Sequence, residues 1–84
     1  MMGGVPVERQ WVLVLKNGTV AIDWGDGLFQ DVYSGKFFEG TEAQVSHTIT
    51  DGELDMLQYA GYATFDGRNV FFQGLPERQL KELD

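Results

Sequence analysis

The pair Asn17-Gly18, set between two apolar runs, constrains the fold more than any other feature of this chain. The runs cover residues 11–16 and 19–24. Asn-Gly is the preferred pair for a two-residue type I′ turn, because both central residues of that turn need a positive φ. Such a turn predicts an antiparallel hairpin in which Trp11 lies opposite Trp24.

The predicted register divides this hairpin into two faces, because side chains alternate along a strand. The larger apolar side chains share the face expected to enter the core: Trp11, Leu13, Leu15, Val20, Ile22 and Trp24. Val12 and Val14 lie on the opposite face together with Lys16 and Asp23. That face is only half polar, so its valines need cover from a helix or from a partner chain.

Turn residues and alternation predict more strands after this hairpin. Gly25-Asp26-Gly27 is typical of a turn, and short strands are expected over residues 28–33, 36–39 and 43–49. A second hairpin is expected over residues 62–73, with a turn at Asp66-Gly67 or across Asp66 to Asn69. Its inward positions carry apolar side chains: Ala63, Phe65, Val70 and Phe72.

The segment Thr50-Asp51-Gly52-Glu53 fits a capping box, the pattern that begins many helices. It predicts one helix near residues 51–60, which Gly61 would end. Pro76 suits the first position of a short C-terminal helix. We therefore expect the α+β class, with a small antiparallel sheet of about 5–7 short strands that forms a bent meander or an open barrel.

The length of 84 residues suits one small domain. Residues 1–9 are expected to form a flexible N-terminal lead-in, because Gly3-Gly4 is permissive and no periodic pattern begins before Gln10. Residues 10–84 are then expected to form the single α+β domain.

The formal net charge of −7 belongs to the middle of the chain. Between residues 23 and 55, one base, Lys36, stands against eight acids: Asp23, Asp26, Asp31, Glu39, Glu42, Asp51, Glu53 and Asp55. These acids are candidates for a surface that attracts a protein with a basic patch. A surface that only keeps the protein soluble, and a mimic of nucleic-acid phosphates, are the alternatives.

Several classes of function conflict with the composition. The absence of cysteine excludes disulfides, thiolate nucleophiles and Cys-based metal sites, and one histidine excludes a histidine-rich site. Acidity argues against direct nucleic-acid binding, which relies on clustered Lys and Arg. No apolar run approaches the ~20 residues that a bilayer requires. We expect a cytoplasmic protein that binds no membrane, cofactor or metal.

Catalytic interpretations of the sequence have little support. The spacing of Asp23 and Asp26 does not match a calcium-binding loop. Ser46 and His47 are adjacent in a predicted strand, so their side chains are expected to point to opposite faces and not to bond. A hydrolase that uses paired carboxylates would need a deep cleft, which a chain of this length rarely forms. The protein is therefore predicted not to be an enzyme.

The sequence thus predicts a non-catalytic protein-interaction or regulatory module. The acids would guide encounter, and uncovered apolar side chains would supply contact area: Val12, Val14, Trp24 and Phe71. The same uncovered faces predict a homodimer, unless the helices cover them. The alternative function is an inhibitor that mimics nucleic acid and occupies a basic nucleic-acid-binding protein, as phage or mobile-element inhibitors do.

Overall fold

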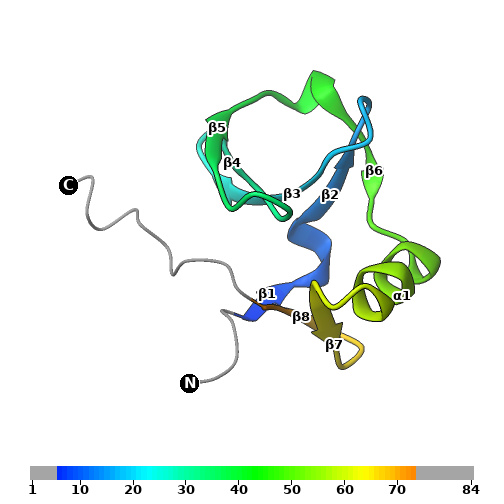
Figure 1. Ribbon diagram of the computed structural model, residues 1–84. Helices are drawn as coiled ribbons and strands as arrows, with labels where there is room; N and C mark the ends of the chain where they lie inside the picture. Colours follow the sequence, from blue (N-terminus) through cyan, green and yellow to red (C-terminus); the bar gives the residue numbers. More distant parts are fainter. Residues whose placement is uncertain (1–5, 74–84) are drawn as a thin grey trace.

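Residues 6–73 of a computed structural model fold as two antiparallel sheets and one nine-residue helix (Figure 1). The predicted α+β class is confirmed. The strands, however, divide between a sheet of five and a sheet of three. The predicted C-terminal helix lies outside the described residues. The helix found within residues 6–73 is too short and too polar to cross a bilayer.

The strands of the larger sheet are β2 (Val12–Leu15), β3 (Val20–Gly25), β4 (Leu28–Asp31), β5 (Phe37–Glu39) and β6 (Val45–Thr48). Their order in the sheet is β5-β4-β3-β2-β6, so β2 to β5 form a meander and β6 pairs with β2. A short 3-10 helix, η2 (Glu42–Gln44), precedes β6. Figure 1 shows that this sheet is strongly curved.

The smaller sheet has the order β1-β8-β7 and contains the second predicted hairpin. Its strands are β1 (Pro6–Glu8), β7 (Ala63–Phe65) and β8 (Asn69–Phe72). Ala63 pairs with Phe72 and Phe65 pairs with Val70, so the four predicted inward positions share one face, and the turn spans Asp66 to Asn69. Three of these four side chains are buried and Phe65 is half-buried.

The predicted N-terminal lead-in is wrong for residues 6–9. Val7 pairs with Val70 and is buried in the core, so Pro6–Glu8 is a strand. The Arg9 amide then donates a hydrogen bond to the Arg68 carbonyl, at 2.9 Å. A single apolar residue such as Val7 gives no periodic signal in the sequence. Its burial comes from pairing with β8, which lies far away along the chain.

The first hairpin has a register one residue away from the predicted one. Val14 pairs with Val20 and Val12 pairs with Ile22. Gly18 has a φ of 91°, whereas Asn17 does not have a positive φ, so a type I′ turn is absent. The Gly18 amide instead donates to the Leu15 carbonyl at 2.9 Å, which indicates a type I turn followed by a left-handed glycine.

This shift exchanges the two faces of β2, while Val20 and Ile22 of β3 stay in the core, and it corrects two predicted contact residues. Val12 and Val14 are buried, with exposed fractions of 0% and 8%, and cannot form a contact surface. Trp11 leaves the hairpin and ends a 3-10 helix, η1 (Arg9–Trp11), where it is 47% exposed. The type I′ geometry occurs instead at Asp26-Gly27, where φ is 57° and 79° between paired Gly25 and Leu28.

The helix α1 (Asp51–Tyr59) begins with the predicted capping box. The Thr50 amide donates to Glu53 Oε1 at 2.9 Å, and the Glu53 amide donates to Thr50 Oγ1 at 3.2 Å. Leu54 and Leu57 are buried, and Gly61, with a φ of 88°, follows the helix. The predicted helix is therefore confirmed.

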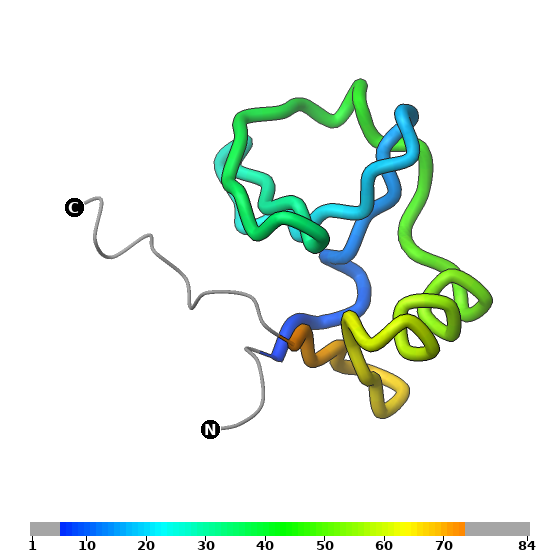
Figure 2. Tube along the Cα trace, viewed as in Figure 1, coloured from blue at the N-terminus to red at the C-terminus, as the bar shows by residue number. Residues whose placement is uncertain are grey.

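One core joins the two sheets and the helix. Its buried side chains come from every layer: Val7, Val12, Val14, Val20, Ile22, Val32, Ile49, Leu54, Leu57, Ala63, Val70 and Phe72. A smaller cluster of Leu15, Ala21 and Phe29 lies apart from it. In Figure 2 the chain passes from the smaller to the larger part through the blue segment and returns after β6, in green. These two crossings place η1 and the end of β6 at the junction of the sheets.

Candidate functional site

A hollow of about 490 Å³ lies over one face of the larger sheet, and we call it the acidic groove. Its lining combines apolar and acidic side chains: Trp11, Leu13, Phe29, Val45, Asp23, Asp26 and Glu42. No basic residue is among the described residues that line it. Aromatic and acidic side chains therefore line the same hollow.

The apolar floor of the acidic groove follows from strand alternation. Asp23 pairs with Phe29, so both face the same side of the sheet. The Phe29 ring packs edge-to-face against Phe38, with centroids 5.7 Å apart. Phe29 also packs with Leu15 and Ala21 in the smaller cluster. The floor is therefore fixed by buried side chains.

Turns and a 3-10 helix position the carboxylates of the groove. Asp23 Oδ1 accepts a hydrogen bond from the Gly25 amide at 2.8 Å. Asp26 is held by the type I′ turn and is exposed. Glu42 begins η2, whose N-terminus is fixed by a 2.9 Å bond from the Thr41 amide to Gln44 Oε1. The groove thus carries negative charge above an apolar floor.

The other predicted acids lie elsewhere. Asp31 Oδ1 accepts hydrogen bonds from the Tyr33 and Ser34 amides, at 2.7 and 3.2 Å, and so shapes the turn after β4. Glu39 is exposed on β5. The remaining three belong to α1: Asp51, Glu53 and Asp55. The eight acids are therefore divided among several elements, and three of them line the groove.

The two remaining apolar candidates are only half-buried. Trp24 packs against the main core, and its Nε1–H donates to Gln30 Oε1 at 2.9 Å. Gln30 is itself 1% exposed, and its Nε2 donates to the Gly35 carbonyl at 3.0 Å. Trp24 therefore satisfies a buried polar side chain. Phe71 lies in β8 opposite Pro6.

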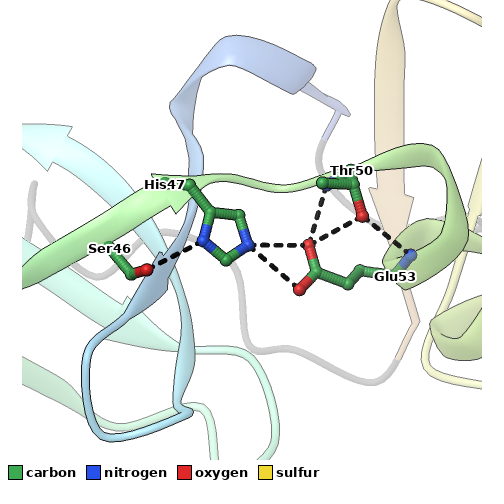
Figure 3. A network of polar contacts seen from close by, with 4 residues as sticks. All are labelled: Ser46, His47, Thr50 and Glu53. Atoms are coloured by element: carbon green, nitrogen blue, oxygen red, sulfur yellow. Dashed lines mark hydrogen bonds and ion pairs between the residues drawn. The ribbon is translucent and has the colours of Figure 1, made fainter.

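Ser46, His47 and Glu53 form a polar network between β6 and α1 (Figure 3). Ser46 Oγ is 2.9 Å from His47 Nδ1, and His47 Nε2 is 3.0 and 3.1 Å from the two Glu53 carboxylate oxygens. The expectation that Ser46 and His47 do not bond is wrong. Val14 pairs with His47 and Leu15 pairs with Val45, so Ser46 is the extra residue of a β-bulge. A bulge interrupts strict alternation and lets neighbouring side chains approach.

The network serves to join β6 to the start of α1. A carboxylate only accepts hydrogen bonds, so His47 Nε2 is the donor to Glu53. The amide of Thr50 holds the pKa of Glu53 below its usual value; partial burial opposes this, and His47 adds to the lowering. Neither Ser46 nor His47 lines the acidic groove, so this trio has no substrate cavity there.

An exposed aromatic pair lies near the C-terminal end of α1. The rings of Tyr33 and Tyr62 pack edge-to-face, with centroids 4.9 Å apart. Burial raises the pKa of Tyr33, and Tyr62, Asp31 and Glu53 add to the rise. Nothing in the local sequence predicts this pair, because it joins a loop to the residue that precedes β7.

Comparisons with protein-family models, with curated proteins and with solved structures find no significant match to this chain. Within residues 6–73, no three His, Asp or Glu side chains gather where they could hold a metal ion. The surface of the molecule itself is therefore the guide to its function.

Proposed function

We propose that this protein is a non-catalytic protein-interaction module whose acidic groove binds a segment of another protein that carries basic side chains. One observation supports the proposal most: an exposed indole, Trp11, lines the same hollow as three carboxylates and an apolar floor. Sequence reasoning included Asp23, Asp26 and Glu42 among the contact residues and missed Trp11.

Arginine and lysine match this combination of groups. Their aliphatic stems bury well against apolar surface while their charged ends remain near carboxylates. A guanidinium or ammonium group also stacks favourably on an indole ring. Carboxylates around the groove would raise the local concentration of a cationic segment and speed encounter.

The alternative, an inhibitor that mimics nucleic acid, has less support from this arrangement. Mimicry needs carboxylates spaced along one track. Here the acids are divided among several elements, and Asp51 is paired with Arg9. A competition assay with a basic DNA-binding protein would separate the two functions, because only the mimic would displace a DNA duplex.

Self-association remains a prediction, but different side chains now support it. Val12 and Val14 are buried, but Met56 and Tyr59 on α1 have exposed fractions of 72% and 96%. These two side chains are the apolar groups that a homodimer would cover. Light scattering measures the oligomeric state directly.

A peptide-binding experiment tests the groove. The probe is a short peptide of alternating Arg and Ser, and calorimetry gives its affinity. We expect the triple variant Asp23→Asn/Asp26→Asn/Glu42→Gln to weaken binding about tenfold, since each exposed pair contributes up to about 1 kcal/mol. Asn at position 23 keeps the acceptor for the Gly25 amide.

The matched control removes the same charge outside the groove, as Glu39→Gln/Asp55→Asn/Asp66→Asn. These three side chains are exposed and do not line the groove. We expect less than about a twofold loss for this control, because none of the three side chains lines the groove and solvent screens exposed charges that make no direct contact. Equal losses in the two triple variants would contradict the proposal, because only net charge would then matter.

A further inference from the structure

A second hollow, of about 540 Å³, adjoins the acidic groove, and we call it the arginine hollow. It is lined by Glu8, Arg9, Gln10, Thr48, Gly67 and Arg68. Gln10 and Thr48 line both hollows, so the two share a wall. Two of the four Lys and Arg residues in the described range 6–73 line this one hollow.

The backbone holds both arginines in place without help from their side chains. The Arg9 amide donates to the Arg68 carbonyl at 2.9 Å. The amides of Arg68 and Asn69 donate to Asp66 Oδ1, at 3.4 and 3.1 Å. Arg9 therefore begins η1 directly beside the β7–β8 turn, and a change of the Arg68 side chain leaves these bonds intact.

The charged side chains around the arginine hollow differ in whether they have a partner. Arg9 is paired with Asp51 on α1. The Glu8 carboxylate accepts a 2.6 Å hydrogen bond from Gln10 Nε2. Among the side chains of residues 6–73, the Arg68 guanidinium has no hydrogen-bond or ion-pair partner. An exposed, unpaired guanidinium at a hollow matches a carboxylate, which it can bind through two parallel N–H···O bonds.

We infer that the arginine hollow binds an Asp or Glu side chain of the same partner segment whose basic residues occupy the acidic groove. This inference rests on the proposed function. The partner would then carry a cation and a carboxylate in a fixed order along its chain, and this module would bind both. Gln10 and Thr48, on the shared wall, can hydrogen-bond the polar backbone between them.

The two hollows are close enough for one short segment. Arg9 and Trp11 belong to the same 3-10 turn and are two residues apart. Consecutive Cα atoms are ~3.8 Å apart, so their Cα atoms lie within ~7.6 Å of each other. An extended peptide rises ~3.3 Å per residue, so a basic residue and an acidic residue about two to four positions apart would span both hollows.

The experiment compares two Arg-Ser peptides that differ at a single residue, placed about two to four positions after the last Arg. One peptide has Glu there and the other has Gln. A second pair carries the same change before the first Arg, so both chain directions are tested. Because the protein has a formal charge of −7, Glu should weaken binding unless a local cation receives it. We expect Glu to strengthen binding about two- to fivefold in one of the two pairs.

Arg68→Gln should reverse the sign of this effect, so that Glu weakens binding, while the Gln peptides bind the variant as they bind the original protein. Lys36→Gln is the control, since it removes the same charge outside both hollows. Glu peptides that bind no better than Gln peptides in either direction would overturn the inference. That result leaves the proposed function standing if the Gln peptides still bind the groove. Failure of the Gln peptides to bind would contradict the proposed function itself.

Discussion

The two hairpins of this protein carry similar signals in the sequence, yet only one has the inward face that those signals predict. In β7–β8, Ala63 pairs with Phe72 and Phe65 with Val70, so the four expected inward side chains share one face. In β2–β3, every pair is shifted by one residue. The strands differ in their second faces. The outward side of β7–β8 carries two polar side chains, Thr64 and Asn69, besides Phe71, whereas β2 reads Val-Leu-Val-Leu and is apolar on both sides.

A register slip moves every side chain of a strand to the other face. In β7–β8 that slip would bury polar groups, so the hydrophobic pattern alone selects the register. In β2 it would exchange one apolar face for another and change burial little. The turn then decides, and Asn17-Gly18 adopts the three-residue loop instead of the two-residue one. Alternation thus specifies register only where the outward face carries polar side chains that a slip would bury.

The largest expected effect comes from testing the two faces of β2 directly. Val12→Asp places an unpaired charge at a side chain that is 0% exposed, and we expect it to cost at least about 3–5 kcal/mol of unfolding free energy. Leu13→Asp, at a half-buried position beside it, should cost about 1 kcal/mol, the typical effect of a point mutation. Urea denaturation of both variants measures the difference. The predicted type I′ register would require the opposite ranking.

A smaller effect distinguishes the turns. Asn17→Gly should destabilise the protein by about 1 kcal/mol, because Asn17 has no positive φ and glycine adds chain entropy to the unfolded state. It also loses the 2.9 Å bond from the Thr19 amide to Asn17 Oδ1. Asp26→Gly should instead be neutral or stabilising by up to about 1 kcal/mol, because Asp26 has a φ of 57°. Equal effects of the two changes in thermal melts would contradict this assignment of turn types.

The elements predicted correctly are those that short-range chemistry determines. The capping box of Thr50 and Glu53 specifies the start of α1 within four residues. The Ser46 bulge could not be predicted, because it depends on how β6 meets β2, a distant strand. β1 was missed for the same reason, since Val7 is buried only through its pairing with β8.

The candidate site shows the same division. Its acids could be named from charge alone, since Asp23, Asp26 and Glu42 belong to the acidic stretch. Their meeting with Trp11 could not, because the position of Trp11 depends on the register of β2–β3. Arg68 was also missed, since its place beside Arg9 follows from the pairing of β1 with β8. Local charge identifies candidate residues, and long-range pairing decides which of them share a surface.

The smallest expected effect concerns the junction of the two regions, where His47 on β6 bonds Glu53 on α1. The pKa of Glu53 is lowered in the folded protein, chiefly by the Thr50 amide. A lowered pKa adds stability above the unfolded value, and that stability is lost as the pH falls through the folded value. Glu53→Gln removes this carboxylate, so the stability advantage of the original protein over the variant should shrink as the pH falls.

Chemical denaturation of both proteins from about pH 6 to about pH 3 measures this difference. The effect should be small, because the Glu53 side chain is 36% exposed and solvent screens its interactions. Asp55→Asn, two residues further along α1, is the control for the loss of one exposed carboxylate. A constant difference between the original protein and Glu53→Gln across this range would mean that the carboxylate charge adds no stability through the Thr50 cap or the contact with His47.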